Sequence, residues 1–523
     1  MKISISYPPI INNLGQKAMV SQNRNVQYFK KPTYLLPVVQ AQAATKLKKN
    51  GFDVIWDDGN ADLKTFEEWY LDLIKIKPDV IFMEGTTPVM HFLWDLSKRL
   101  KEDLPKTVLI IGGYHAMRQP QETLLKSSFD IVAKSTNLDF MLLELCNELN
   151  LNNLNLNKME TKGITYRKQD SVDEIIDNGA FKMVENLDAS ETIDRGLVKW
   201  KNYAYENGNF LQTPGTYSSS VIRDCMFGKC TFCRYNGPEL SFSKMSIIKS
   251  VDEYEDLIIN HGVKEIFDDS GVWFRGKDAI DFAKEIIKRG LHKKDCYFGF
   301  NTRFEYLDEE TIKWLAKANF RFILIGLESG SNYTLNKLNK GYSMREIRMN
   351  LKLMTKYGLH PHLTIMVGYY WETKEMLDET VNVVKDFMFK GLARTLQVTI
   401  CTPVDYTPYH IECIENKKLI VDNYDDFDMS KVIVKTPIDH SFYYKAIKEM
   451  YSIAFHPKFI LRQLLFLLRF KRRDWQFLFT YGYRAIRRVN QHIFNLTHKS
   501  QTNEKKTSSH SLNNLKIKFS PSK

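Results

Sequence analysis

The chain has 523 residues, 43% of them apolar and 26% charged, which is the length and composition of a protein with two or three globular domains. Its net charge of +12 is concentrated at the C-terminus, because the segment from His456 onward contains fifteen Lys/Arg and only two Asp/Glu. The first 455 residues therefore have a net charge of −1, which argues against nucleic-acid binding by the chain as a whole. Only seven cysteines, no basic and apolar leader, and no uncharged apolar run of about 18 residues predict a protein of the reducing cytoplasm without a membrane span.

The first 150 residues alternate between apolar strands and amphipathic helices. The strands are expected at 2–7, 52–58, 78–85 and 107–116, and the helices at 38–51, 66–77, 89–103 and 138–149. Continuous apolar strands separated by helices are typical of a parallel sheet covered on both faces. Residues 1–150 are therefore predicted to form a doubly wound, Rossmann-like (flavodoxin-like) domain, with its ligand at the carboxyl ends of the strands.

The rest of the chain divides into four further segments. An Asn/Leu-rich run marks 151–215 as a linker with short strands, near 162–169 and 179–186. From 216 to 415 the strand and helix pattern returns, with strands expected at 216–223, 265–271, 296–303, 322–329, 360–370 and 395–403. This repetition predicts a partial or full parallel (β/α) barrel with its chemistry at the strand carboxyl ends. A mainly helical region, 416–498, and a disordered basic tail, 499–523, are expected to follow.

Three of the seven cysteines lie within nine positions, directly after the first expected barrel strand. Cys225, Cys230 and Cys233 have the spacing Cys-x4-Cys-x2-Cys. A structural zinc site normally takes four protein ligands, and no fourth cysteine or histidine is close in sequence. Three thiolates can instead hold three irons of a [4Fe–4S] cluster and leave the fourth iron open. A zinc site completed from elsewhere in the chain, and unbound thiols, remain as alternatives.

The cysteine segment, "CMFGKCTFC", resembles that of the radical SAM superfamily, although the usual first gap is one residue shorter. The resemblance implies that Phe232 packs near the adenine of S-adenosylmethionine (SAM). "VKEIFDDSGVWF" is similar to the family's second-strand segment and "IGLESGS" to its fourth-strand motif, which implies SAM contacts for Asp268, Asp269, Glu328 and Ser329. Taken alone, the two aspartates would equally suit a solvated strand end or a helix cap.

Later segments agree with the family in part. "MVGYYWETKE" keeps Gly368, Glu372 and Thr373 of a common motif but replaces its Leu-Pro-Gly centre, and "TPVDYTPYH" departs from the Pro-rich last-strand segment. Asn301 and Arg303 end the third barrel strand, where they either face the site or form a structural ion pair. The family resemblance implies reductive cleavage of SAM to a 5′-deoxyadenosyl radical, with an electron from a flavodoxin- or ferredoxin-type donor.

The first domain lacks Gly-x-Gly-x-x-Gly after its first strand, which argues against a dinucleotide. It resembles the cobalamin-binding domains that precede some radical SAM barrels, on "SYPP", "IWDD", "PDVIFMEGTT" and "VLIIGGYHA". That resemblance implies cobalamin contacts for Asp57, Thr86, Thr87, Gly112, Gly113 and His115. Because the Asp-x-His-x-x-Gly motif is absent, cobalamin is expected without a histidine ligand. Alternatives are an ordinary tight turn for the two glycines, and for His115 a hydrogen bond to the cofactor tail, a surface position, or cobalt ligation.

The segment after His456 mixes aliphatic and aromatic residues with Arg and Lys. Such a helix can lie on an anionic membrane surface, or pack its apolar face on the barrel with its arginines solvated.

The sequence thus predicts a cobalamin-dependent radical SAM enzyme that methylates an unactivated carbon of a small-molecule, lipid or peptide substrate. Radical cyclisation or rearrangement is the alternative within the same family, and a non-catalytic cobalamin or cluster sensor is the alternative of another class. No catalytic acid, base or nucleophile is identifiable from the sequence.

Overall fold

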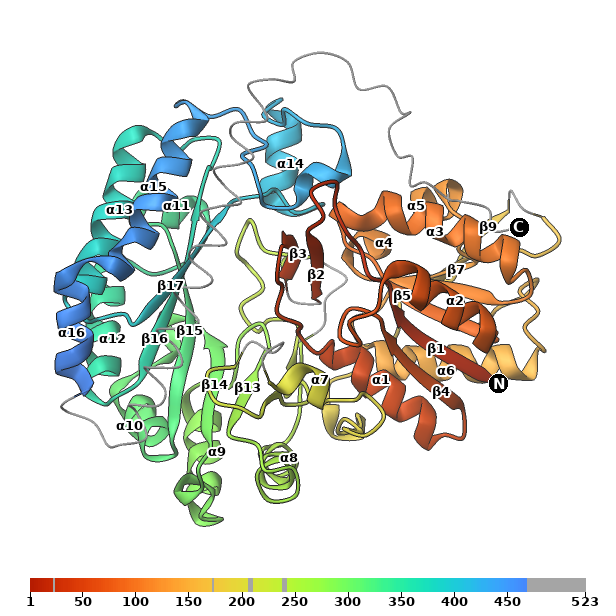
Figure 1. Cartoon of the computed structure of the whole chain (residues 1–523), viewed down its shortest axis with the longest axis horizontal. Coiled ribbons are helices and arrows are strands. Elements are labelled where there is room, and N and C mark those ends of the chain that lie inside the picture. Colours follow the sequence, from red (N-terminus) through yellow and green to blue (C-terminus); the bar gives the residue numbers. More distant parts are fainter. Residues whose placement is uncertain (22–23, 172–173, 206–209, 238–241, 468–523) are drawn as a thin grey trace.

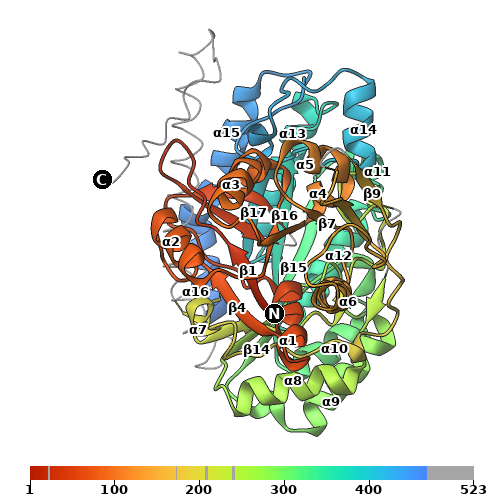
Figure 2. The ribbon, with the colours of Figure 1, turned by 90° about the vertical axis from the view of Figure 1, so that its right-hand side faces the viewer.

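The computed structural model describes residues 1–21, 24–171, 174–205, 210–237 and 242–467. Two α/β units, each built on one large sheet, lie side by side in Figure 1. In Figure 2, seen from the side of the first unit, the strands of the first unit lie in front of those of the second. The architecture confirms the predicted α/β class, with a Rossmann-like domain followed by a partial parallel barrel.

The Rossmann-like sheet has the strand order β4-β1-β5-β6-β7-β8-β9. Its first five strands are parallel, and β8 and β9 add an antiparallel edge. The strands are β1 (Lys2–Tyr7), β4 (Asp53–Asp58), β5 (Val80–Glu84), β6 (Val108–Gly112), β7 (Ile131–Ala133), β8 (Ile164–Arg167) and β9 (Ile175–Asp177). The strand expected near 162–169 is β8, whereas the one expected near 179–186 is wrong: the second strand is β9, at 175–177, and both extend this sheet.

Helices cover both faces of this sheet, as continuous apolar strands require. They are α1 (Val38–Lys49), α2 (Phe66–Ile76), α3 (Met90–Asp103), α4 (Tyr114–Arg118), α5 (Pro120–Lys126) and α6 (Leu138–Leu151). Val80 and Phe82 of β5 join the core of α1 and α6, whereas Ile81 and Met83 join that of α2 and α3. The core of α1 and α6 is continuous with that of the barrel, so this face of the sheet is turned toward the second unit.

A β-hairpin that the sequence patterns did not indicate follows β1. It consists of β2 (Lys17–Ser21) and β3 (Arg24–Phe29), and it lies between the two units in Figure 1. Its strands lack the continuous apolar run of strands such as β5 and β6, because little of the hairpin is buried in a core.

The second unit is an open sheet of six parallel strands, β10-β13-β14-β15-β16-β17. Its strands are β10 (Gly215–Tyr217), β13 (Glu265–Asp268), β14 (Tyr297–Thr302), β15 (Phe320–Glu328), β16 (His360–Val367) and β17 (Thr395–Ile400). Helices α8 (Ile247–Ile259), α9 (Gly276–Lys288), α10 (Glu309–Lys317), α11 (Asn332–Lys337), α12 (Met344–Lys356) and α13 (Lys374–Phe389) connect them. β10 and β17 are the two edges, so this is a partial barrel.

The first barrel strand, expected over 216–223, is divided in two. β10 ends at Tyr217, and β11 (Ile222–Arg223) pairs with β12 (Ser243–Lys244) in a separate antiparallel ribbon. The cause is the intervening serine run: Ser218 donates to Asp268, and Ser219 donates to Glu253 from its backbone and its hydroxyl. These hydrogen bonds replace those of the strand ladder.

The chain beyond the barrel contains helices α14 (Pro408–Glu415), α15 (His440–Ser452) and α16 (Pro457–Leu467), with a short α7 (Lys201–Ala204) earlier in the connection. The tail predicted to be disordered lies outside the described residues. No helix in the described ranges is both long enough and apolar enough to cross a bilayer.

Candidate functional site

The three clustered cysteines lie in a loop of residues 224–237, called here the cysteine loop, directly after β11. Gly228 has φ +56°, and a Cβ at this position would stand 3.4 Å from the carbonyl oxygens of both Cys225 and Tyr235. Glycine therefore makes the turn within the long first gap, between Cys225 and Cys230.

The segment after α11 holds the middle of the cysteine loop. The backbone N–H of Thr231 donates to the Leu338 carbonyl (3.2 Å), and its hydroxyl donates to the Lys337 carbonyl (3.1 Å). The Asn339 side-chain amide donates to the Lys229 carbonyl (2.9 Å). The loop is thus fixed to the connection that follows β15, at the carboxyl end of the barrel.

The cysteine thiols are partly buried and interact with one another. Burial raises the pKa of Cys225, and burial together with the neighbouring Cys230 raises that of Cys233 to about 12. Within the described ranges, no three His, Cys, Asp or Glu side chains converge closely enough to hold a single metal ion. A tetrahedral zinc site needs sulfurs about 3.8 Å apart, given Zn–S bonds of about 2.3 Å. In a [4Fe–4S] cluster each thiolate binds a different iron, so the three cysteine sulfurs can lie farther apart than in a zinc site.

The cysteine loop is in direct contact with the first domain. Arg118 of α4 donates through Nη2 to the carbonyl oxygens of Arg234 (3.2 Å) and Asn236 (3.5 Å). The Arg234 guanidinium stacks on the Tyr114 ring at 3.6 Å, and the Tyr235 ring lies edge-on to Tyr114, with 6.4 Å between centroids. The cysteine loop therefore packs directly against the carboxyl edge of the Rossmann-like sheet.

Some polar groups at this junction are buried without a hydrogen-bond partner in the described part of the chain. Arg234 is 6% exposed, yet none of its three guanidinium nitrogens has a hydrogen-bond partner within the described ranges. The Thr86 hydroxyl and the Tyr114 hydroxyl are likewise unsatisfied there. A buried cation without acceptors is costly, so these groups fit a site whose acceptors come from a bound molecule.

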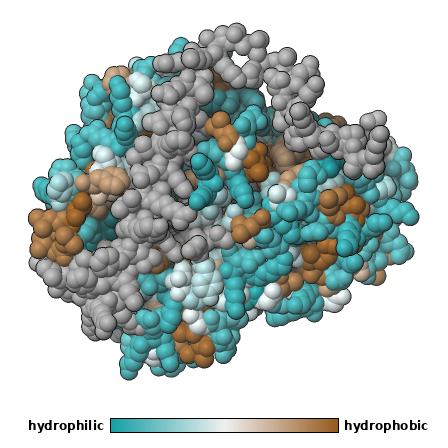
Figure 3. All heavy atoms as spheres, viewed as in Figure 1, coloured by the Kyte–Doolittle hydropathy of each residue, from teal (hydrophilic) through white to brown (hydrophobic). Residues whose placement is uncertain are grey.

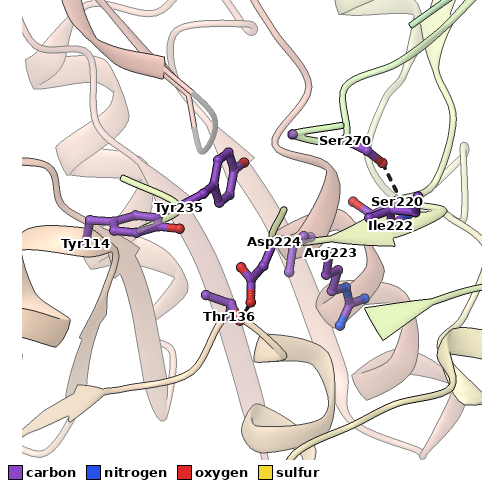
Figure 4. Close-up of a pocket in the computed structure, with 10 residues that line it drawn as sticks. Tyr114, Thr136, Ser220, Ile222, Arg223, Asp224, Tyr235 and Ser270 are labelled. Atoms are coloured by element: carbon purple, nitrogen blue, oxygen red, sulfur yellow. Dashed lines mark hydrogen bonds between the residues drawn. The ribbon is translucent and has the colours of Figure 1, made fainter. Parts of the chain in front are cut away.

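A small cavity lies beside this contact, between the two units (Figure 4). Tyr114 and Thr136 line it from the first domain, and Asp224 and Tyr235 line it from the cysteine loop. Thr136 donates to Asp224 across the junction (2.9 Å). With a volume of about 20 Å³, the cavity has room for a water molecule but not for an organic ligand.

Asp268 and Asp269 end β13 in different surroundings. Asp268 is fully buried and accepts hydrogen bonds from the Ser218 hydroxyl (2.9 Å) and the Ser270 N–H (3.0 Å), while burial raises its pKa to about 6. Asp269 is only partly buried and accepts from the Asn301 side-chain amide (3.1 Å). Of this pair, Asp269 is the more exposed side chain, and Asp268 stabilises the turn after β13 through its hydrogen bonds.

Glu328 and Ser329, at the end of β15, also differ. Glu328 has φ +62°, and its buried carboxylate accepts from Lys340 Nζ at 3.0 Å, with that ammonium 5.8 Å from the Phe232 ring centroid. Lys340 thus contacts both Glu328 and the Phe232 ring of the cysteine loop. Ser329 is fully buried and shares a hydrogen bond with the Thr380 hydroxyl (3.1 Å), which ties β15 to α13.

The packing of the protein itself explains why residues 112 and 113 are glycines. A Cβ on Gly113, where φ is +94°, would stand 2.3 Å from the Gly85 carbonyl oxygen, and one on Gly112 would stand 3.0 Å from the Phe82 ring. The close approach of β5 and β6 therefore requires both glycines, whatever the domain binds.

Thr87 and His115 face a carboxylate from the other unit. Asp405, after β17, accepts from the Thr87 hydroxyl (2.6 Å) and lies 2.9 Å from His115 Nδ1, while its carbonyl accepts from Arg118 (2.5 Å). His115 is 1% exposed, so it is not a surface histidine, and its other ring nitrogen lies 3.7 Å from Glu122. This cluster joins the two units.

Asp57, at the end of β4, is buried, and the groups around it only weakly stabilise a negative charge on its carboxylate. Ser6 donates to it at 3.5 Å, and Lys64 lies 4.0 Å away. Burial, opposed by Lys64, raises the pKa of Asp57 to about 7.

The residues of the "GYYWET" segment support the barrel end. The Glu372 carboxylate is fully buried and accepts from the Gly368 N–H (2.6 Å), and burial raises its pKa to about 8. The Thr373 hydroxyl accepts from the Met376 N–H and caps α13.

Sequence patterns did not point to Arg118, Arg234, Lys340 or Asp405. Arg234 directly follows the last clustered cysteine, and Asp405 lies within the "TPVDYTPYH" segment, but neither side chain stood out by itself. Arg118 and Lys340 had no local signal and are brought to the site by contacts across the fold.

Comparisons with known proteins agree with this geometry. The model of the radical SAM superfamily matches residues 219–384. A curated relative, the anaerobic magnesium-protoporphyrin IX monomethyl ester cyclase of Cereibacter sphaeroides, is 28% identical over 408 residues, 77% of this chain and 63% of its own length. An uncharacterised methyltransferase of Pyrococcus horikoshii is 24% identical over 389 residues, 73% of this chain and 80% of its own. The chain therefore spans somewhat less than two thirds of the cyclase.

Solved structures resemble both units together. The cobalamin-dependent SAM radical enzyme OxsB has a TM-score of 0.64 at 16% identity, over 94% of this chain and 71% of its own. The radical SAM methyltransferase TsrM of Kitasatospora setae has a TM-score of 0.62 at 12% identity, and the match covers 86% of this chain and 90% of TsrM. Residues 219–384 are thus a radical SAM domain, and the described chain as a whole has the fold of the cobalamin-dependent radical SAM enzymes.

Proposed function

We propose that this protein is a cobalamin-dependent radical SAM enzyme that transfers a methyl group to an unactivated carbon. The observation that carries the proposal is the contact between the cysteine loop and the carboxyl edge of the Rossmann-like sheet, through Arg118, Tyr114 and Arg234. Methyl transfer requires the radical generator and the methyl donor to reach one substrate carbon. A single site shared by both units meets that requirement.

Cys225, Cys230 and Cys233 would hold a [4Fe–4S] cluster with one open iron. When bound, the cluster and SAM supply the 5′-deoxyadenosyl radical, and cobalamin supplies the methyl group. Asp269, after β13, and Glu328, at the end of β15, are proposed to orient SAM, with Phe232 against its adenine. Asp268 and Ser329, fully buried in protein hydrogen bonds, are proposed to support these contacts from beneath.

Cobalamin would lie against the carboxyl edge of the Rossmann-like sheet. The unsatisfied Thr86 and Tyr114 hydroxyls and the Arg234 guanidinium fit a ligand rich in amide carbonyl groups. Gly112, Gly113 and Asp57 lie at the ends of β6 and β4, on the same edge. Because the sequence lacks the Asp-x-His-x-x-Gly motif, cobalamin is proposed to bind without a histidine ligand.

The proposed setting is the cytoplasm, with a flavodoxin- or ferredoxin-type electron donor and a small-molecule, lipid or peptide substrate. Radical cyclisation is the second candidate, because one curated relative carries the name of a cyclase.

The products of SAM distinguish these functions. The anaerobically reconstituted protein, loaded with cobalamin and given an extract of its host's metabolites, is expected to yield 5′-deoxyadenosine and S-adenosylhomocysteine together with a methylated product. Deoxyadenosine without S-adenosylhomocysteine would favour cyclisation or rearrangement. Absence of both from protein with a full cluster would reject an enzymatic role in favour of a sensor.

A peripheral membrane contact is proposed for α16. Its polar side chains face the barrel: Arg462 donates to the Lys390 carbonyl (3.2 Å), and Gln463 accepts from Arg394 (2.6 Å). Four aliphatic side chains on the opposite side are exposed, namely Ile460, Leu461, Leu464 and Leu465. Figure 3 shows apolar surface at the left edge of this face, where Figure 1 has α16. Apolar residues beside a basic segment suit an anionic lipid surface.

Replacing both Leu461 and Leu464 with serine is expected to reduce the fraction of protein that floats with anionic vesicles about tenfold or more, since each buried leucine contributes roughly 1.5–3 kcal/mol. Ile259→Ser, at an exposed isoleucine of α8, is the matched control and should float like the parent. Equal flotation of the double variant and the parent would reject the contact.

A further inference from the structure

One of the three clustered sulfurs has a hydrogen-bond donor from outside the cysteine loop. The backbone N–H groups that influence Cys225 and Cys233, those of Phe227, Gly228 and Tyr235, belong to the loop itself. Cys230 Sγ instead accepts from a side chain 73 positions away, Nη1 of Arg303, at 3.4 Å. One of the three sulfurs is therefore coupled to the barrel by a cation.

Arg303 is held rigidly for this contact. It is 4% exposed, and its guanidinium stacks on the Phe227 ring at 3.4 Å. Nε donates to Glu305 (2.5 Å), and Nη2 donates to the carbonyl of Lys340. Since every guanidinium nitrogen is engaged, the side chain cannot turn away from the sulfur without breaking other hydrogen bonds. The positive charge has a fixed position beside Cys230.

Such a charge favours the reduced form of a bound cluster. Reduction adds one electron to an assembly whose thiolates are already negative. A buried cation and an N–H···S hydrogen bond stabilise that added charge more than they stabilise the oxidised form. Lys340, the other buried cation nearby, is neutralised by Glu328 at 3.0 Å, whereas Glu305, which pairs with Arg303, is partly solvated. Arg303 is accordingly the less compensated of the two cations.

We propose that Arg303 is a positioning residue that raises the reduction potential of the cluster held by the cysteine loop. The role acts through Cys230 and rests on the proposed cluster. It would make one-electron reduction by an external low-potential donor easier, before any substrate chemistry.

The test is an EPR-monitored redox titration of the full-length, anaerobically reconstituted protein with dithionite. Arg303→Met, which removes the charge and the donor, is expected to titrate at a more negative potential, and Arg303→Lys, which keeps the charge, at a value between that and the parent's. Arg275→Met is the matched control, because Arg275 stacks on Tyr306 (4.9 Å) at the same end of the barrel, and its variant should titrate like the parent. An unshifted potential in Arg303→Met with a full cluster would overturn the proposal.

A second variant decides the matter if Arg303→Met fails to retain iron. Glu305→Gln removes the negative charge that partly compensates Arg303 and leaves the contact with Cys230 in place. Its cluster should titrate at a less negative potential, and an unchanged or more negative value would also overturn the proposal. Parent protein that binds no iron and sulfide would instead contradict the proposed function itself.

Discussion

Cys230→Ala is expected to abolish both the iron–sulfur cluster and the cleavage of SAM. The variant removes one of three thiolates, and it also leaves the Arg303 cation facing an alanine. Changes to partners of metal ligands already cost roughly 10–100-fold in affinity or activity, so the loss of a ligand should exceed about 100-fold. Iron and sulfide analysis, with 5′-deoxyadenosine measured after reduction, checks this result.

Cys146→Ala is the matched control for that experiment. Cys146 is buried in α6, outside the cysteine loop, and its replacement should change stability only modestly while leaving iron, sulfide and deoxyadenosine at the parent level. A Cys230→Ala protein with a full cluster and normal SAM cleavage would contradict the cysteine triad as the site of the cluster.

Asp405→Ala is expected to lower the free energy of unfolding by about 3 kcal/mol at neutral pH, since it leaves buried polar partners without their acceptor. The carboxylate accepts from Thr87 and pairs with His115 across the two units. Chemical denaturation followed by tryptophan fluorescence measures the effect. Asp425→Ala, which breaks an exposed pair with His91 (3.1 Å) between the same two units, should cost less than about 1 kcal/mol.

The stabilisation by Asp405 also has a defined pH dependence. Burial by itself would raise the pKa of this carboxyl, but the hydrogen bonds from His115 and Thr87 hold it below its usual value. The contribution is therefore fully present above the unfolded-state pKa of about 3.9, and it is lost as the pH falls through the lower folded-state value. The difference in stability between the parent and Asp405→Ala should narrow in that acidic range. A constant difference from pH 7 to pH 3 would contradict an ionised Asp405 as its source.

Sequence patterns predicted most of the fold because they are local. Apolar runs such as those of β5 and β6, and helices with capping residues such as Thr65 and Ser343, can be recognised from a few neighbouring residues. The patterns were wrong where long-range contacts prevailed. The serines after β10 hydrogen-bond to Asp268 and Glu253 and end the strand early, and nothing local states which sheet the short strands β8 and β9 join.

By itself, the sequence determined the α/β order of the domains and the three-cysteine loop, since strand periodicity and ligand spacing are both written in neighbouring residues. Only the tertiary structure decided how the two units meet. It placed Arg234 on Tyr114 and Asp405 on His115, residues up to 290 positions apart. It also left Asp269 partly exposed, while Asp268 and Ser329 are buried in hydrogen bonds with Ser218 and Thr380. The physical reason is that burial and the choice of hydrogen-bond partner arise from packing between distant segments, which no short stretch of sequence encodes.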